Sequence, residues 1–138
     1  MTKDFELIEH TADVGIMAYG VDVRGAFVNA ARGMFSLMVE LETINEVEHR
    51  DIEASAPDVE SLLAAWLNEL ICLFDAENML FSRFEITEFG ETRLKARVYG
   101  EPVNDSRHRL RVGIKAATYH MLEVDGSDGG RVQVLFDI

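Results

Sequence analysis

The fold of this chain is decided by one long helix, which residues 57–78 encode with the sequence PDVESLLAAWLNELICLFDAEN. Pro57 suits the first turn of a helix, and the carboxylates of Asp58 and Glu60 suit the positive end of its dipole. Residues 75–78 end the element. Its apolar side chains recur every three or four positions and form one broad stripe, which comprises Val59, Leu62, Leu63, Trp66, Leu67, Leu70, Ile71 and Phe74.

Strand patterns follow this helix. Apolar and polar residues alternate over residues 80–86 and again over residues 93–99, and residues 89–91 between them predict a hairpin turn. The same alternation runs over residues 132–138, up to the last position of the chain. We therefore expect at least three strands in the second half of the protein.

Three strands and a second helix are predicted ahead of the quoted stretch. The strands cover residues 5–8, 14–20 and 46–55, and the last of them has the charges of a solvent edge. Asp22 suits the N-cap of the second helix, whose apolar positions run from Phe27 to Leu41. Gly33 inside this helix predicts a close contact there, because glycine otherwise weakens a helix interior.

Residues 110–124 are ambiguous, since residues 114–117 fit a helical turn and residues 118–124 fit a strand. Helices cluster early in the chain and strands cluster late. This order is typical of an α+β fold rather than of an alternating parallel one. We predict a single domain over residues 1–138, with two layers in which a mixed or antiparallel sheet packs against two main helices.

The composition is that of a folded globular protein, with 48% hydrophobic and 28% charged residues. No apolar stretch reaches the length that spans a bilayer, and Asp4, Glu6 and Glu9 interrupt any signal-peptide core. Cys72 is the single cysteine, so an intramolecular disulfide is excluded, and we expect it to be an inert, packed thiol. These features predict a cytoplasmic protein without a membrane partner.

The net charge of −12 argues against general nucleic-acid binding, which needs clustered basic residues. The basic residues are nevertheless unevenly placed. One interpretation is a solvated strand face followed by a loop. The alternative is one basic face on an acidic body, suited to a protein partner of mixed charge. Seven of the thirteen lysine and arginine residues lie in one segment, and they are Arg93, Lys95, Arg97, Arg107, Arg109, Arg111 and Lys115.

The C-terminus is the first candidate for a site. If the final strand is docked, the carboxylate of Ile138 is fixed beside the side chain of Asp137, and the two need a metal, a basic residue or water as counterion. Asp13, which follows His10 closely, is either a turn cap or a further oxygen ligand. As a ligand it would complete an all-oxygen site, which suits Ca²⁺ or Mg²⁺ and not zinc.

Two basic side chains near the end of the chain are further candidates. Lys115 lies among the apolar residues Ile114, Ala116 and Ala117, and we expect it to reach an anion, with Asp13 and Asp137 the nearest candidates. His120 is either a structural histidine or a general base.

With these segments in hand, the chain resembles the archease family over nearly all of its length. No single motif is specific, but the motifs occur in order and together are specific. They are residues 10–16 (HTADVGI) and 18–20 (AYG), Ala26, Phe27, Ala30, Ala31 and Met34, residues 66–70 (WLNEL) and 73–75 (LFD), Gly100 with Glu101, residues 114–116 (IKA) and 118–120 (TYH), and residues 136–138 (FDI).

The resemblance implies a small metal-binding protein, not itself an enzyme, that assists an RtcB-type tRNA-splicing RNA ligase. Such a ligase guanylylates itself at a histidine, with GTP and a divalent metal, before it joins RNA ends. Archease-like proteins promote that step and allow repeated turnover. The implied metal ligands are Asp13, Asp137 and Ile138, and the implied metal is Ca²⁺, with Mg²⁺ or Mn²⁺ as alternatives.

Other residues of the matching motifs, Lys115, His10 and His120, are further functional candidates. The chain departs from the family pattern at two positions. Gly113 stands where an acidic residue is expected before Lys115, and Arg131 stands where an aromatic residue is common.

Two other functions remain open at this point. A metal-dependent hydrolase would use Asp13 and Asp137 with His120 as base. A general chaperone-like module would protect unrelated clients without depending on Asp13.

Overall fold

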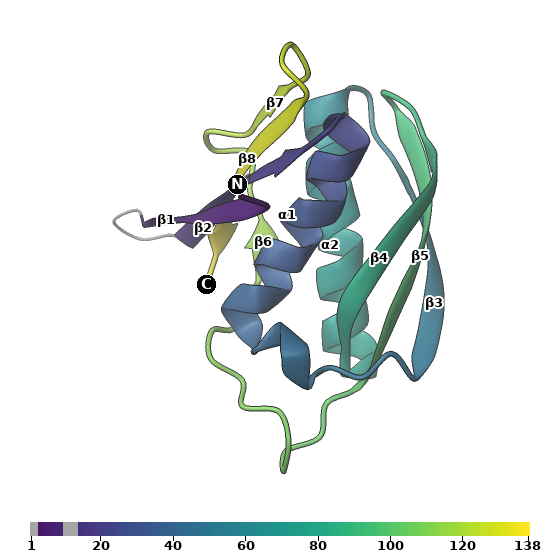
Figure 1. Cartoon of the computed structure of the whole chain (residues 1–138), viewed down its shortest axis with the longest axis vertical. Helices are drawn as coiled ribbons and strands as arrows, with labels where there is room; N and C mark the ends of the chain where they lie inside the picture. The colour runs from purple at the N-terminus through teal and green to yellow at the C-terminus, as the bar shows by residue number, and fades with distance from the viewer. Residues whose placement is uncertain (1–2, 10–13) are drawn as a thin grey trace.

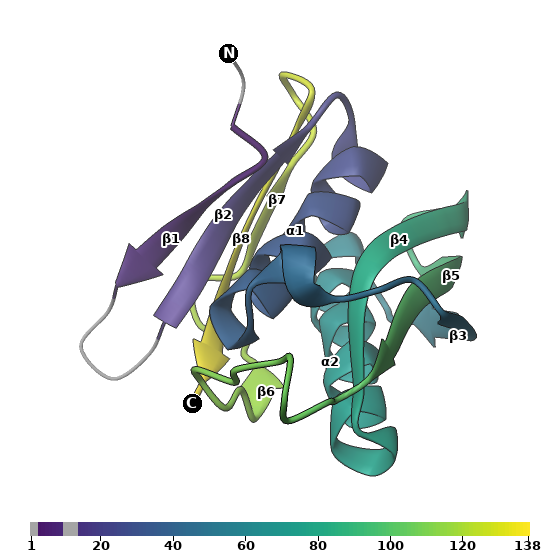
Figure 2. The same ribbon diagram turned by 60° about the horizontal axis from the view of Figure 1, so that its bottom comes forward.

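The structure is a computed structural model of the whole chain, and it describes residues 3–9 and 14–138. Two antiparallel sheets lie on either side of a pair of helices (Figures 1 and 2). In chain order the elements are β1 (Phe5–Glu9), β2 (Val14–Gly20), α1 (Val23–Met38), the short 3₁₀ helix η1 (Leu41–Thr43), β3 (Glu48–Ser55), α2 (Val59–Glu77), β4 (Met79–Phe89), β5 (Arg93–Pro102), β6 (Ala116–Ala117), β7 (Glu123–Asp125) and β8 (Gly130–Asp137).

The larger sheet has the order β1-β2-β8-β6, with β7 also paired to β8, and the smaller has the order β3-β5-β4. Helix α1 packs on β2 and β8 of the larger sheet and on β4 of the smaller, and α2 contacts β3 and β6. The predicted α+β class with two main helices is therefore confirmed. The strands are divided between two sheets, because the paired helices have apolar surface on opposite sides.

Both helices begin at the aspartates that local chemistry favours. The side chain of Asp22 accepts a hydrogen bond from the Gly25 amide at 2.8 Å, and Asp58 accepts one from the Ser61 amide at 2.7 Å. We had expected Pro57 in the first turn of α2, and this is wrong, because Pro57 precedes the N-cap Asp58. Helix α1 ends at Met38, so Leu41 begins η1 and does not extend the helix. No helix in the described part of the chain is long and apolar enough to cross a membrane.

The core forms where the two helices and both sheets meet. The indole N–H of Trp66, fully buried on α2, donates to the carbonyl of Phe27 on α1 at 3.0 Å. Phe35 of α1 stacks on Phe84 of β4, with ring centroids 5.8 Å apart. The predicted close contact at Gly33 is with the larger sheet, since a Cβ there would lie 3.0 Å from Ile16.

The ambiguous segment 110–124 is mostly irregular, and the predicted helical turn over residues 114–117 is wrong. Ala117 is instead held in β6, because the side chain of Asn68 on α2 accepts from its amide at 2.8 Å and donates to its carbonyl at 3.4 Å. Only the last part of the predicted strand over residues 118–124 forms, as β7. A turn precedes β7, and in it Met121 adopts a left-handed conformation with φ of 56°.

The prediction of a packed Cys72 is also wrong, since the residue is exposed. Its neighbour Ile71 is buried and belongs to the apolar stripe. One step along a helix rotates the next side chain by about 100°, which turns Cys72 away from the core.

We expect a thiol reagent such as Ellman's reagent to label Cys72 in the native protein at one equivalent, before any unfolding. Exposure to solvent gives the reagent access, and a Cys72→Ser variant is the control for unspecific reaction. A thiol that reacted only after denaturant was added would contradict the exposure.

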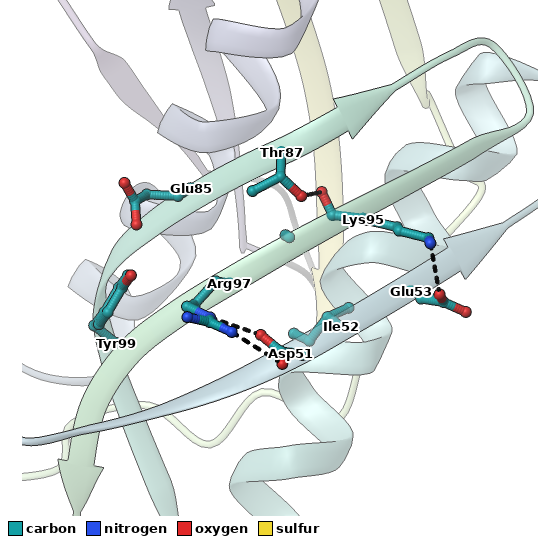
Figure 3. Close-up of a pocket in the computed structure, with 9 residues that line it drawn as sticks. Asp51, Ile52, Glu53, Glu85, Thr87, Lys95, Arg97 and Tyr99 are labelled. Carbon is teal, nitrogen blue, oxygen red and sulfur yellow. Dashed lines mark hydrogen bonds and ion pairs between the residues drawn. The ribbon is translucent and has the colours of Figure 1, made fainter.

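In the strand part of the basic segment, Lys95 and Arg97 are neutralised by carboxylates of the neighbouring strand. Arg97 on β5 forms an ion pair with Asp51 on β3 at 2.8 Å, and Lys95 lies 3.4 Å from Glu53 (Figure 3). Register places each cation opposite its carboxylate, because Arg97 pairs with Asp51 and Lys95 with Glu53 across the two strands. Of the two interpretations, the solvated face therefore applies to β5.

Candidate functional site

Three segments that are distant in sequence meet at the C-terminal end of β8. Val14 at the start of β2 pairs with Phe136, and Ala116 of β6 pairs with Asp137 on the other side. The amide of Lys115 donates to the carbonyl of Asp137 at 2.8 Å. Figure 2 shows this end of β8 beside β6. Strand pairing thus holds β8 on both sides up to Phe136, and Asp137 is paired on the β6 side.

Asp137 and Ile138 are both exposed at this end, and Ile138 keeps 49% of its surface accessible. The side chain of Asp137 forms no hydrogen bond or ion pair with another described residue. An accessible, unpaired carboxylate beside a second oxygen donor fits the donor chemistry of a hard cation. Asp13 and His10 lie outside the described residues.

Lys115 lies beside Asp137 through its backbone, but its side chain forms no ion pair with Asp137. It lines a depression of about 390 Å³ on the α2 side of β6, together with Asn68, Cys72 and Asp75. Asn68 positions this corner, because its two hydrogen bonds to Ala117 fix β6 against α2. Sequence reasoning missed its role, although Asn68 lies in one of the matching motifs.

His120 lies exposed in the turn between β6 and β7. Within residues 3–9 and 14–138, no three His, Cys, Asp or Glu side chains are grouped closely enough to hold a metal ion. Among the described residues, His120 and Asp137 therefore do not form a metal-binding group with a third such side chain.

A second polar cluster, which sequence reasoning also missed, fastens the loop over residues 103–115. Glu101 at the end of β5 is only 5% exposed. One of its oxygens accepts from the guanidinium of Arg107 at 2.6 Å, and the other accepts from the Asn45 amide at 2.7 Å and lies 3.0 Å from Nε2 of His108. These donors, Arg107 first among them, lower the pKa of Glu101 to about 2.

The hydrogen bonds of His108 define which ring nitrogen carries its proton. Nδ1 accepts a hydrogen bond from the Asn104 amide at 2.8 Å, so the proton lies on Nε2. Nε2 then donates toward Glu101 and the carbonyl of Thr43, both 3.0 Å away. A neutral histidine thus completes the buried cluster. The adjacent pair Gly100 and Glu101, which matches the family pattern, is the sequence signal that could have pointed to it.

Comparison with known proteins matches residues 5–138 to the archease protein family (MTH1598/TM1083). The chain is 38% identical over 141 residues to protein archease of Methanosarcina mazei, covering 99% of this chain and 97% of that one. It is 36% identical over 130 residues to protein archease of Sulfolobus acidocaldarius, covering 94% and 93%.

Two solved structures have the same fold. The solution structure of Methanobacterium thermoautotrophicum protein 1598 aligns with a TM-score of 0.85 at 35% identity, and covers 99% of this chain and 100% of that one. A Thermotoga maritima protein described as an archease and possible chaperone aligns with a TM-score of 0.60 at 23% identity, covering 100% and 98%. The match to the family over almost the whole length, with curated relatives above one-third identity, places this chain in the archease family.

Proposed function

We propose that this protein is a non-enzymatic, metal-binding activator of an RtcB-type tRNA-splicing RNA ligase in the cytoplasm. Its partner is a protein, and it promotes guanylylation of the ligase and repeated turnover. The observation that carries the proposal is the accessible, unpaired carboxylate of Asp137 at the end of a strand that is paired on both sides. Membership of the archease family supports a protein as the partner.

The ligands in this proposal are Asp13, Asp137 and Ile138, the last through its carboxylate or its backbone oxygen. They would hold Ca²⁺, or Mg²⁺ or Mn²⁺ in its place, and the bound cation would supply positive charge at the nucleotide phosphates. Strand pairing with β6 holds the backbone of Asp137, so little conformational freedom remains there to be lost when this end of β8 meets a partner. Lys115, His10 and His120 are the further candidates for contact with the ligase.

The proposal is tested by following guanylylation of an RtcB-type ligase at limiting metal, with and without this protein. We expect an increase in rate of at least about tenfold, within the range of ordinary coupling between two binding events. Excess metal should reduce the difference. A rate that is the same with and without the protein at every metal concentration would contradict the proposal.

A chaperone-like function is the second candidate, because the Thermotoga maritima relative is described as a possible chaperone. The same preparation is therefore added to an unrelated protein that aggregates on heating. Protection of that client, unaffected by Asp13→Ala, together with no effect on the ligase, would favour the chaperone over the activator.

A further inference from the structure

In the irregular loop that joins β5 to β6, buried and exposed side chains alternate along the sequence. His108 and Ile114 are buried and Val112 is half-buried, whereas Arg107, Arg109, Arg111 and Lys115 are exposed. Alternate residues of an extended segment point to opposite sides. Leu110, which is 45% exposed, is the exception. The loop therefore presents a row of cations on one side, and Figure 2 shows it passing close to the end of α1.

The part of this row from Arg107 to Arg111 is fixed to the body of the protein at both ends. Arg107 is held by Glu101 and by the carbonyl of Thr43, to which it donates at 2.6 and 3.1 Å. At the other end the amide of Arg111 donates to the carbonyl of Met38 at 2.8 Å. Arg109 lies between the two fixed positions. The arginines are thus presented by an anchored backbone.

The three arginines line a hollow of about 480 Å³, whose opposite wall is Val39, Glu40 and Thr43. Arg109 forms no hydrogen bond or ion pair with any described residue, and the guanidinium of Arg111 has one long contact, 3.4 Å to the carbonyl of Ser36. This differs from Arg97 on β5, which is paired with Asp51 (Figure 3). Among the residues that the structure describes, Glu40 is the one carboxylate that lines the hollow.

Two guanidinium groups with unused donors therefore share one hollow in a protein of net charge −12. Their mutual repulsion is relieved by an anion bound between them. A guanidinium offers paired N–H donors that match the oxygens of a phosphate group in a bidentate way. The volume lies in the range of small-ligand pockets, roughly 300–1,000 Å³, and a hollow of this kind suits a compact anion better than a flat contact.

We propose that the hollow formed by Arg107, Arg109 and Arg111 with Val39, Glu40 and Thr43 binds a phosphate group. The group belongs either to a free nucleotide or to the terminus of an RNA strand, and the same guanidinium donors serve both. The acidic body disfavours a long track of phosphates, so one terminal group or a short polyphosphate is the fitting ligand. The inference does not rest on the proposed function.

The test measures binding of inorganic pyrophosphate to the purified protein at low salt by isothermal titration calorimetry. We expect Arg109→Gln to weaken binding about tenfold, the effect of losing a charge-assisted hydrogen bond. Arg109→Lys should keep only part of the affinity for pyrophosphate, because an ammonium lacks the bidentate geometry. Arg93→Gln is the matched control, since the side chain of Arg93 is also exposed and forms no hydrogen bond or ion pair with a described residue. It should change the affinity less than twofold, as expected for a charge outside the hollow.

Two further pairs of titrations distinguish the source of the phosphate. The first compares a nucleoside diphosphate with its nucleoside. The second compares a short RNA that carries a terminal phosphate with the same RNA without that phosphate. Phosphate-dependent binding in either pair that Arg109→Gln weakens supports the site and names its source. No binding of pyrophosphate at millimolar concentration, or equal losses in Arg109→Gln and Arg93→Gln, would overturn it. A glutamate-rich peptide that bound more tightly than pyrophosphate, with the same dependence on Arg109, would also overturn it. Unchanged thermal unfolding of each variant verifies that the fold is intact.

Discussion

Replacement of Asp137 by asparagine is expected to weaken binding of Ca²⁺ by at least about tenfold, the scale on which even outer partners of metal ligands act. Most of the stimulation of ligase guanylylation should be lost with it. The substitution keeps the size of the side chain and removes its charge. Because the Asp137 side chain has no partner among the described residues, thermal stability should hardly change. Calorimetric metal titration and the guanylylation assay measure the two effects.

Asp128→Asn is the control for this substitution, since Asp128 is an exposed aspartate in the turn that precedes the other end of β8. It should leave metal affinity and stimulation unchanged. A second variant that carries two glycines after Ile138 moves the terminal carboxylate away from the strand. Loss of metal affinity in this variant supports Ile138 as a ligand. If Asp137→Asn stimulated ligase guanylylation as strongly as the wild type, the Asp137 carboxylate would be excluded as the functional group.

Glu101→Gln is expected to lower the free energy of unfolding at pH 7 by about 3 kcal/mol, the stability linked to lowering a carboxyl pKa from 4.5 to about 2. Both carboxylate oxygens accept hydrogen bonds from donors on Arg107, Asn45 and His108. An amide offers one acceptor and turns its NH₂ group toward a donor. The buried mismatch adds to the lost ion pair. Urea unfolding followed by tryptophan fluorescence measures the change, because Trp66 is the single tryptophan.

The pH dependence of the same variant gives an independent check. The pKa of Glu101 is lower in the folded protein than in the unfolded chain, so its contribution is fully present above about pH 5 and is lost as the pH falls through 4.5 toward 2. The difference between wild type and Glu101→Gln should therefore shrink between pH 6 and pH 3. Glu91→Gln in the exposed hairpin turn is the control and should show no such difference. A gap that stayed constant with pH would mean that packing, not charge, stabilises the cluster.

The local elements of this fold could be predicted because their determinants lie close together in sequence. The stripe around Trp66 indicated α2, and Asp58 and Asn78 mark its ends through hydrogen bonds within one turn. Asp22 begins α1 for the same reason. Alternation indicated β4 and β5 and the turn between them. These signals also supported the α+β class and the resemblance to the archease family.

Pairings between distant segments could not be predicted in this way. Asn68 and Ala117 are 49 positions apart, and their hydrogen bonds decide that β6 is extended and not helical. The neutralised cations of β5 depend on the register with β3, and the exposure of Cys72 depends on which side of α2 is covered. For the candidate site, sequence alone proposed Asp137 and Ile138 as oxygen donors but did not show that β2 and β6 pair with the end of β8.

The sequence by itself therefore determined the helices, most of the strands, the N-cap of α1 and the family, because periodicity and capping act over a few residues. The tertiary structure alone decided the division into two sheets, the cluster of Glu101 with Arg107 and His108, and the arginine hollow beside α1. Each of these depends on groups brought together by packing across dozens of positions. The sequence gives the charge of each side chain, but the fold decides which group that side chain contacts.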